Sequence, residues 1–197
     1  MKSVKPSEPV TSWIQRLGAG DPRALEAVIP LLYNELRAVA GHQLKLERAD
    51  HTLSATALVH EAWFRLARQR RIAAEDRLQF LSIAGHTMRR VLVDWARSKK
   101  RAKRGGGQAD LPLDEVEPFL TVEEADELLA LDEALERLAA VNERGAKVVE
   151  HRFFAGLSQD ETAEALGISP KTVQRDWIAA RAWLRKEVQR DLSVDPS

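Results

Sequence analysis

The segment SQDETAEALGISPKTVQRDW, from Ser158 to Trp177, constrains the fold more than any other part of this 197-residue sequence. Ser158 and Glu161 have the spacing of a capping box, in which a serine and a glutamate three residues later bind free amides at a helix start. Gly167 can take the left-handed conformation that ends a helix. Ser169 can cap a second helix that begins at Pro170. The segment therefore predicts a helix-turn-helix.

The second of these helices has an apolar side and a polar side. Its apolar stripe, predicted to face the core, consists of Val173, Trp177, Ala180, Leu184 and Val188. The N-terminal end of a recognition helix enters the major groove of DNA, where Arg and Lys pair with guanine and Gln with adenine. The predicted DNA-binding residues are Ser169, Lys171, Thr172, Gln174, Arg175 and Arg181. The alternative is a plain helical hairpin with a solvated charged face.

Helical periodicity extends over most of the chain, and no stretch shows the clean alternation of a strand. Asp21 and Pro22 have the residue types that cap and begin a helix. Thr121 and Glu124 form a second capping box, and Asn142 can cap a further helix. We expect helices over about 21–47, 54–69, 75–103, 121–140 and 142–154. The predicted fold class is all-α.

The formal net charge of zero hides a separation of charge along the chain. Residues 1–104 contain twenty Lys and Arg against ten Asp and Glu, whereas residues 105–136 contain eleven Asp and Glu and no base. The boundary RAKRGGGQADLPLDEVEP has the composition of a linker. We therefore predict two small helical domains joined by a flexible acidic linker. The divisions are an N-terminal extension (1–20), a first domain (21–104), the linker (105–120), a second domain (121–190) and a C-terminal tail (191–197).

The acids between Asp110 and Glu136 directly follow the basic end of the first domain, and two interpretations are open. One is a solvated linker followed by an acidic helix start, because acids favour helix N-termini. The other is that this segment competes with DNA for the basic arm while the protein is free.

The helix expected over 75–103 has basic residues opposite its apolar face. Leu81, Ala84, Met88, Val91, Leu92 and Trp95 share the apolar side. A one-sided basic stripe is typical of nucleic-acid binding, although basic residues are also common in the last turns of helices. The predicted DNA-binding residues here are His86, Arg89, Arg90, Arg97, Lys100, Arg101, Lys103 and Arg104.

The helix expected over 54–69 has a buried stripe of Ala55, Val59, Ala62 and Leu66, and Phe64 points to the opposite side. An exposed aromatic residue among charges is typical of a protein-binding surface. A single exposed Phe is also common without a function. The pattern alone leaves both interpretations open.

Three segments follow one another in the order LVHEAWFRL, FLSIAGHTMRRVLVDWARSKKRAKR and LSQDETAEALGISPKTVQRDW. This order resembles an extracytoplasmic-function (ECF) sigma factor of the sigma-70 family over residues from about 20 to 190. The resemblance is greatest to the subgroup with ATALVHEAW-like and TV-x-RDW-like stretches. It implies a region 2 domain that melts and reads the minus-ten promoter element, and a region 4 domain that reads minus-thirty-five.

The resemblance also assigns roles to particular residues. LVHEAWF is similar to the helix that docks on the largest subunit of core RNA polymerase, which gives the polymerase-binding candidates His60, Glu61, Phe64, Arg65 and Arg68. The Arg-rich helix through Arg104 corresponds to the minus-ten helix, and the loop 69–79 lies where an extruded base is held. The helix from Pro170 corresponds to the reader of minus-thirty-five. The segment TLSAT replaces the usual acidic lead of the docking helix, and His60 replaces the usual Gln.

The expected function is that of a sigma factor, which binds core RNA polymerase and promoter DNA and directs transcription initiation. The alternative is a helix-turn-helix regulator that binds DNA without polymerase. We expect no enzyme activity, since no nucleophile–base set or phosphate loop is visible. The chain has no cysteine and its histidines lack metal-ligand spacing, so we expect no metal or cofactor. We expect a cytoplasmic protein with no membrane segment and no small-molecule substrate, and an anti-sigma factor is a further partner that the resemblance allows.

Overall fold

The computed structural model describes residues 9–21, 23–44, 52–69, 72–103 and 122–194. These residues contain α-helices and one π-helical turn and no strand, so the predicted all-α class is confirmed. In chain order the elements are α1 (Val10–Gly18), α2 (Ala24–Leu44), α3 (Thr52–Ala67), α4 (Arg77–Lys103), α5 (Val122–Val141), α6 (Glu143–Val149), the π-helical turn η1 (Glu150–Phe154), α7 (Gln159–Leu166) and α8 (Pro170–Val194).

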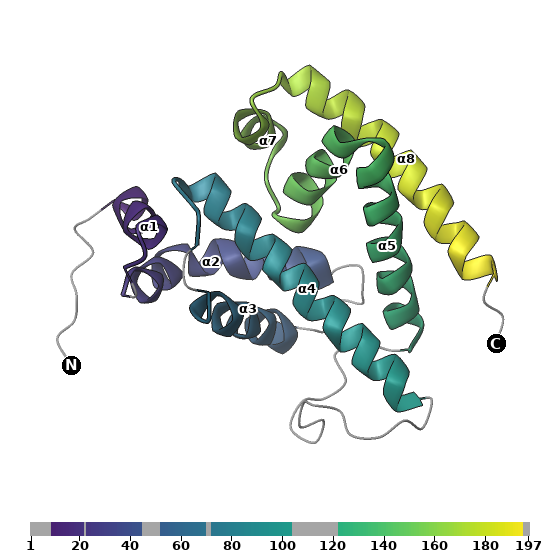
Figure 1. Cartoon of the computed structure of the whole chain (residues 1–197), viewed down its shortest axis with the longest axis horizontal. Helices are drawn as coiled ribbons and strands as arrows, with labels where there is room; N and C mark the ends of the chain where they lie inside the picture. The colour runs from purple at the N-terminus through teal and green to yellow at the C-terminus, as the bar shows by residue number, and fades with distance from the viewer. Residues whose placement is uncertain (1–8, 22, 45–51, 70–71, 104–121, 195–197) are drawn as a thin grey trace.

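Helices α1 to α4 form the first half of the molecule (Figure 1). Leu36 of α2, Leu58 of α3 and Phe80 of α4 are buried in its core. Helix α1 lies in the segment that the sequence analysis treated as an extension. Its Ile14 and Leu17 are buried in the same core. The helix is hard to predict from the sequence, because it is short and Pro9 gives it no side-chain cap.

Helices α5 to α8 and η1 form the second half, where Leu135 and Leu138 pack with Leu184 of α8. Asn142 caps α6 as predicted, and its side chain accepts a hydrogen bond from the Gly145 amide at 3.0 Å. The predicted single helix over 142–154 is wrong in its second part. From Glu150 to Phe154 the backbone widens into a π-helical turn, which ends with a bond from the Ala155 amide to the Glu150 carbonyl.

The predicted helix-turn-helix is confirmed at each of its signals. The Ser158 amide donates to the Glu161 carboxylate at 2.9 Å and the Glu161 amide to the Ser158 hydroxyl at 3.2 Å, which completes the capping box. Gly167 ends α7 with a φ of 63°. Ser169 caps α8 by accepting from the Thr172 amide at 3.1 Å. Val173 is buried at the crossing of the two helices, so their relative position is fixed by local packing.

The other helix ends lie within a few residues of their predicted positions. Helix α4 begins at Arg77 rather than near residue 75. Helix α2 is described as far as Leu44, and its predicted end near residue 47 lies outside the described residues. The capping box expected at Thr121 lies outside the described residues, as do Pro22 and the linker 105–120.

The two halves contact each other through α4, which lies along α5 and η1 (Figure 1). The core of the first half continues across this contact, because it includes Ala125 and Leu128 of α5 and Ala155 and Leu157 after η1. The described residues therefore form one packed unit in this structure. The two-domain division of the sequence stays a prediction.

We predict that Thr162→Val stabilises the protein. Thr162 is buried, and within the described part of the chain its hydroxyl has no hydrogen-bond partner. An unsatisfied buried polar group costs about 1–3 kcal/mol, and valine has nearly the same shape. The variant should raise the free energy of unfolding by about 1 kcal/mol in urea unfolding. The control is Thr172→Val, which should not stabilise because Thr172 Oγ1 lies 2.9 Å from Ser169 Oγ. Equal effects of the two substitutions would contradict the explanation.

Candidate nucleic-acid interface

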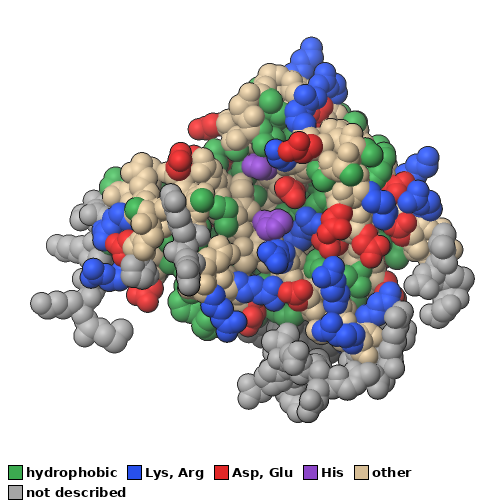
Figure 2. Space-filling view, in the orientation of Figure 1, with side chains coloured by type: hydrophobic (Ala, Val, Ile, Leu, Met, Phe, Trp, Pro, Cys, Tyr) green, Lys and Arg blue, Asp and Glu red, His purple; other side chains and the backbone are tan. Residues whose placement is uncertain are grey.

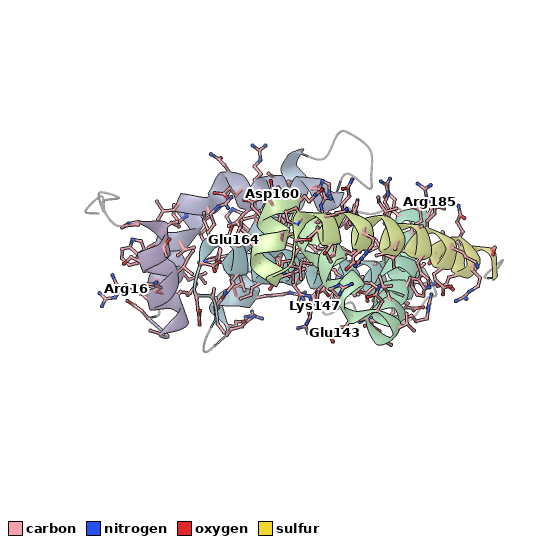
Figure 3. All side chains as sticks on the ribbon, turned by 90° about the horizontal axis from the view of Figure 1, so that it is seen from above. Arg16, Glu143, Lys147, Asp160, Glu164 and Arg185 are labelled. Carbon is pink, nitrogen blue, oxygen red and sulfur yellow. The ribbon has the colours of Figure 1, made fainter. Side chains whose placement is uncertain are left out.

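The start of α8 presents a polar surface to solvent. Lys171, Gln174 and Arg175 are exposed, and Val173 between them is buried, as the helical periodicity predicts. Ile178, one turn beyond Arg175, is also exposed. Ser169 and Thr172 bond each other and the helix start, so their hydroxyls serve the cap. Figure 3 shows α7, with Asp160 and Glu164, beside the first turns of α8.

Arg181 is also exposed, about two turns farther along α8 than Gln174. It lines a cavity of about 560 Å³ between the two halves, together with Trp177, Leu184 and Arg185 of α8. Arg185 is farther along α8 than the turns that cross α7 (Figure 3). The structure therefore groups Lys171, Gln174 and Arg175 at the start of α8, and leaves Arg181 exposed farther along the helix, beside the contact between the halves.

An ion pair holds α8 against α6 next to Arg175. The Asp176 side chain is nearly buried and accepts hydrogen bonds from the Arg144 guanidinium. These bonds hold the pKa of Asp176 below its ordinary value and raise the pKa of Arg144. The pair ties α8 to α6, and the Arg175 Nε also donates to the Asp176 carboxylate at 3.3 Å, so the same acid helps to position Arg175.

Helix α4 exposes part of its predicted basic stripe. His86, Arg90, Arg97 and Arg101 are exposed on the side away from the buried Met88. The surrounding protein removes part of the water around the His86 ring, and this partial desolvation lowers the pKa of the imidazole and favours the neutral ring near pH 7. The helix is described as far as Lys103, and Arg104 lies outside the described residues.

Two other bases of the stripe, Arg89 and Lys100, are paired with acids of α5. Arg89 is buried and donates to the Asp132 carboxylate at 2.5 Å. Lys100 lies 2.9 Å from Asp126. Figure 2 shows acidic and basic side chains interspersed where α4 and α5 meet. In this arrangement Arg89 is directed at α5 rather than at solvent.

Backbone contacts reinforce the same junction. Gln43 of α2 is buried and donates to the carbonyl oxygens of Gly85 at 3.0 Å and Phe154 at 2.6 Å. Gly85 lies so close to η1 that an added Cβ atom would be 2.5 Å from the Phe154 carbonyl oxygen. Sequence reasoning missed Gln43 and Gly85. A glycine inside a helix is one sign of tight packing, but Gly41 of α2 is also inside a helix and has open space beside it, so the sequence does not distinguish Gly85.

The candidate polymerase-binding residues lie on and just after α3. Ala55, Val59, Ala62 and Leu66 form the buried stripe that the sequence predicted. Phe64 is 50% exposed, with its ring centroid 4.7 Å from that of Trp63. His60 and Arg68 are exposed, and Glu61 is half-buried. Arg65 reaches across to α4 and bonds Asp94 at 2.6 Å, so it also ties α3 to α4.

The described residues contain no helix with the length and apolarity needed to cross a membrane. No group of three or more His, Asp or Glu side chains in these parts of the chain is placed to hold a metal ion.

A comparison with known protein families supports the family resemblance of the three sequence segments given under the sequence analysis. A family model for ECF sigma factors matches residues 7–190, which is nearly the whole chain. The chain belongs to the ECF sigma factor family. No curated protein sequence matched the chain in a similarity search. As an ECF sigma factor it has a role in transcription initiation, and members of the family act with core RNA polymerase and promoter DNA.

In this ECF sigma factor, Asp176→Asn should lower the free energy of unfolding at pH 7 by about 1–2 kcal/mol, because a charged hydrogen bond with Arg144 is lost. The hydrogen bonds from Arg144 hold the folded-state pKa of Asp176 below that of an unpaired aspartate. Such a carboxylate stabilises the fold above its unfolded pKa, and the contribution is lost as pH falls through the folded pKa. The variant should therefore lose less stability than the wild type below about pH 4.

The measurement is urea unfolding at several pH values from neutral to acid. Asp160→Asn, an exposed acid of α7, serves as the control. Parallel stability curves for wild type and Asp176→Asn would contradict this assignment.

Proposed function

We propose that this protein binds core RNA polymerase through α3 and directs it to specific promoters, with α4 reading the minus-ten element and α8 reading minus-thirty-five. The observation that carries the proposal is the family match over residues 7–190, together with two separate basic helix surfaces on one chain. A helix-turn-helix regulator would need only one of these surfaces.

The start of α8 supports the minus-thirty-five role. Lys171, Gln174 and Arg175 are the residue types that read base edges in the major groove. They project from a helix whose register is set by Val173 in the core and by the Arg144–Asp176 pair. A rigid support of this kind keeps the side chains in position to discriminate between bases.

The exposed surface of α3 supports the polymerase role. Phe64 and His60 are both exposed on it, whereas most residues of its opposite side are buried. A half-exposed aromatic residue flanked by charges is typical of an interface hot spot.

The direct test is transcription in vitro. The purified protein is added to core RNA polymerase with a library of promoter fragments, and the start sites of the transcripts are sequenced. Discrete transcripts that require both components support the proposal. Specific DNA binding without any polymerase-dependent transcript would favour the regulator instead.

Arg175→Ala should weaken promoter binding of the holoenzyme by about 1–3 kcal/mol if Arg175 reads a base edge. The loss should depend on the base sequence of the minus-thirty-five element, because the alanine variant no longer distinguishes the bases. Lys186→Ala removes the same charge from an exposed position farther along α8 and should not change sequence preference. A uniform loss on all promoters would make Arg175 a phosphate contact.

Phe64→Ala should weaken binding to core polymerase by about 1–2 kcal/mol and leave the helix content unchanged. Affinity is measured by competition with a labelled wild-type protein, and helix content by circular dichroism. Leu31→Ala, a comparably exposed apolar residue of α2, is the control for general loss of apolar surface. If the two variants bound equally well, Phe64 would have no part in the dock.

A further inference from the structure

Helix α5 and the turn η1 cover one side of α4, the helix that the proposed function uses for minus-ten DNA. We infer that the free protein is closed by this contact, so that its own acidic helix masks part of its DNA-binding surface. This inference rests on the proposed function. In this closed form of the protein, α4 is not available to DNA until the two halves separate.

The charges of the contact show how masking works. The Asp132 carboxylate bonds Arg89 at 2.5 Å through one oxygen and lies 3.8 Å from Arg97 through the other. Asp126, nearly two turns earlier on α5, pairs with Lys100. Carboxylates and phosphates bind guanidinium groups in the same way. The acids of α5 therefore occupy positions that DNA phosphates would take.

Burial makes the masking effective at Arg89. Its side chain is 8% exposed, and its guanidinium group lies 5.1 Å from the centre of the Phe154 ring. Glu150 of η1 lies 3.6 Å from the same group. A phosphate cannot reach Arg89 unless η1 and α5 move away from α4. His86, Arg90 and Arg101 stay exposed, so the masking is partial.

The acids of α5 that make these pairs lie within the segment that the sequence suggested. The sequence suggested a competing segment between Asp110 and Glu136, beginning in the linker. Asp126 and Asp132 lie in that segment but belong to the rigid helix α5. The masking group is therefore a folded surface with a fixed register.

Gly85 gives a way to open the contact without changing any charge. A Cβ atom at this position would lie 2.5 Å from the Phe154 carbonyl oxygen and 2.8 Å from Ala155 Cα, and both are backbone atoms of the second half. Gly85→Ala should therefore separate α4 from η1. Gly41→Ala is the matched control, since Gly41 also lies within a helix and a Cβ there would have nothing within 4 Å.

The experiment measures binding of the free, full-length variants to a fluorescent double-stranded DNA of random sequence, by anisotropy at low salt. If closed molecules outnumber open ones about ten to one, opening should tighten binding about tenfold, because affinity scales with the competent fraction. We expect this for Gly85→Ala and not for Gly41→Ala. Equal affinities for these two variants overturn the inference.

A second pair of variants tests the masking without any change at Gly85, in case Gly85→Ala misfolds locally. Asp132→Lys removes the acid that bonds Arg89, and Glu133→Lys makes the same charge change at an exposed neighbour on α5. Asp132→Lys should bind DNA several-fold more tightly than Glu133→Lys. If the two lysine variants bind alike, net charge alone explains the gain and masking is wrong.

Opening itself is measured by energy transfer between dyes on the two halves. The chain has no cysteine, so Thr11→Cys in α1 and Val141→Cys in α5 provide unique labelling positions, both exposed. Gly85→Ala should lower the transfer efficiency of the free protein, and unchanged transfer overturns the closed form. These measurements use no polymerase. A failure of the proposed function would instead leave the DNA and transfer results intact and abolish promoter-directed transcription.

Discussion

The buried ion pair between Arg89 and Asp132 determines how the two halves of this molecule fit together. Apolar contacts such as Leu128 against the first core tolerate small shifts, because dispersion has no preferred direction. A buried guanidinium group does not, since it must find its acceptors at particular positions. Deleting one partner of such a pair leaves the other charge buried and unpaired, which costs about 3–5 kcal/mol of stability. Separating the two halves instead returns both charges to water. The contact is therefore specific in geometry and still reversible.

The helix-turn-helix could be predicted from the sequence almost residue by residue. Its capping box, its left-handed Gly167 and its second cap at Ser169 are all local devices, each acting within four residues. Local chemistry of this kind is readable without knowledge of the fold. The apolar stripes of α3 and α4 were equally predictable, because helical periodicity determines which side chains face a core.

Features that depend on distant contacts were not predictable. Helix α1 has no side-chain cap and is stabilised by burial of Ile14 and Leu17. Arg89 and Arg90 are adjacent in the sequence, and the positions of α5 and η1 bury Arg89 and leave Arg90 exposed. The surroundings of Arg181 were equally unpredictable, because helical periodicity does not reveal the cavity that Arg181 lines. The sequence thus predicts which helices of the candidate site are basic. It does not predict which of their basic side chains pair with acids of other helices.

The π-helical turn from Glu150 to Phe154 has a further consequence for how this chain can evolve. Such a turn is equivalent to one extra residue inserted into an α-helix. Each residue of an α-helix advances the chain by about 100°, so removing that residue would rotate everything after it by the same angle. The Phe154 carbonyl would no longer meet Gln43, and α7 and α8 would point elsewhere. Side chains in this turn can therefore be exchanged more freely than its length can be changed, and a one-residue deletion there would change the direction of every helix that follows Phe154.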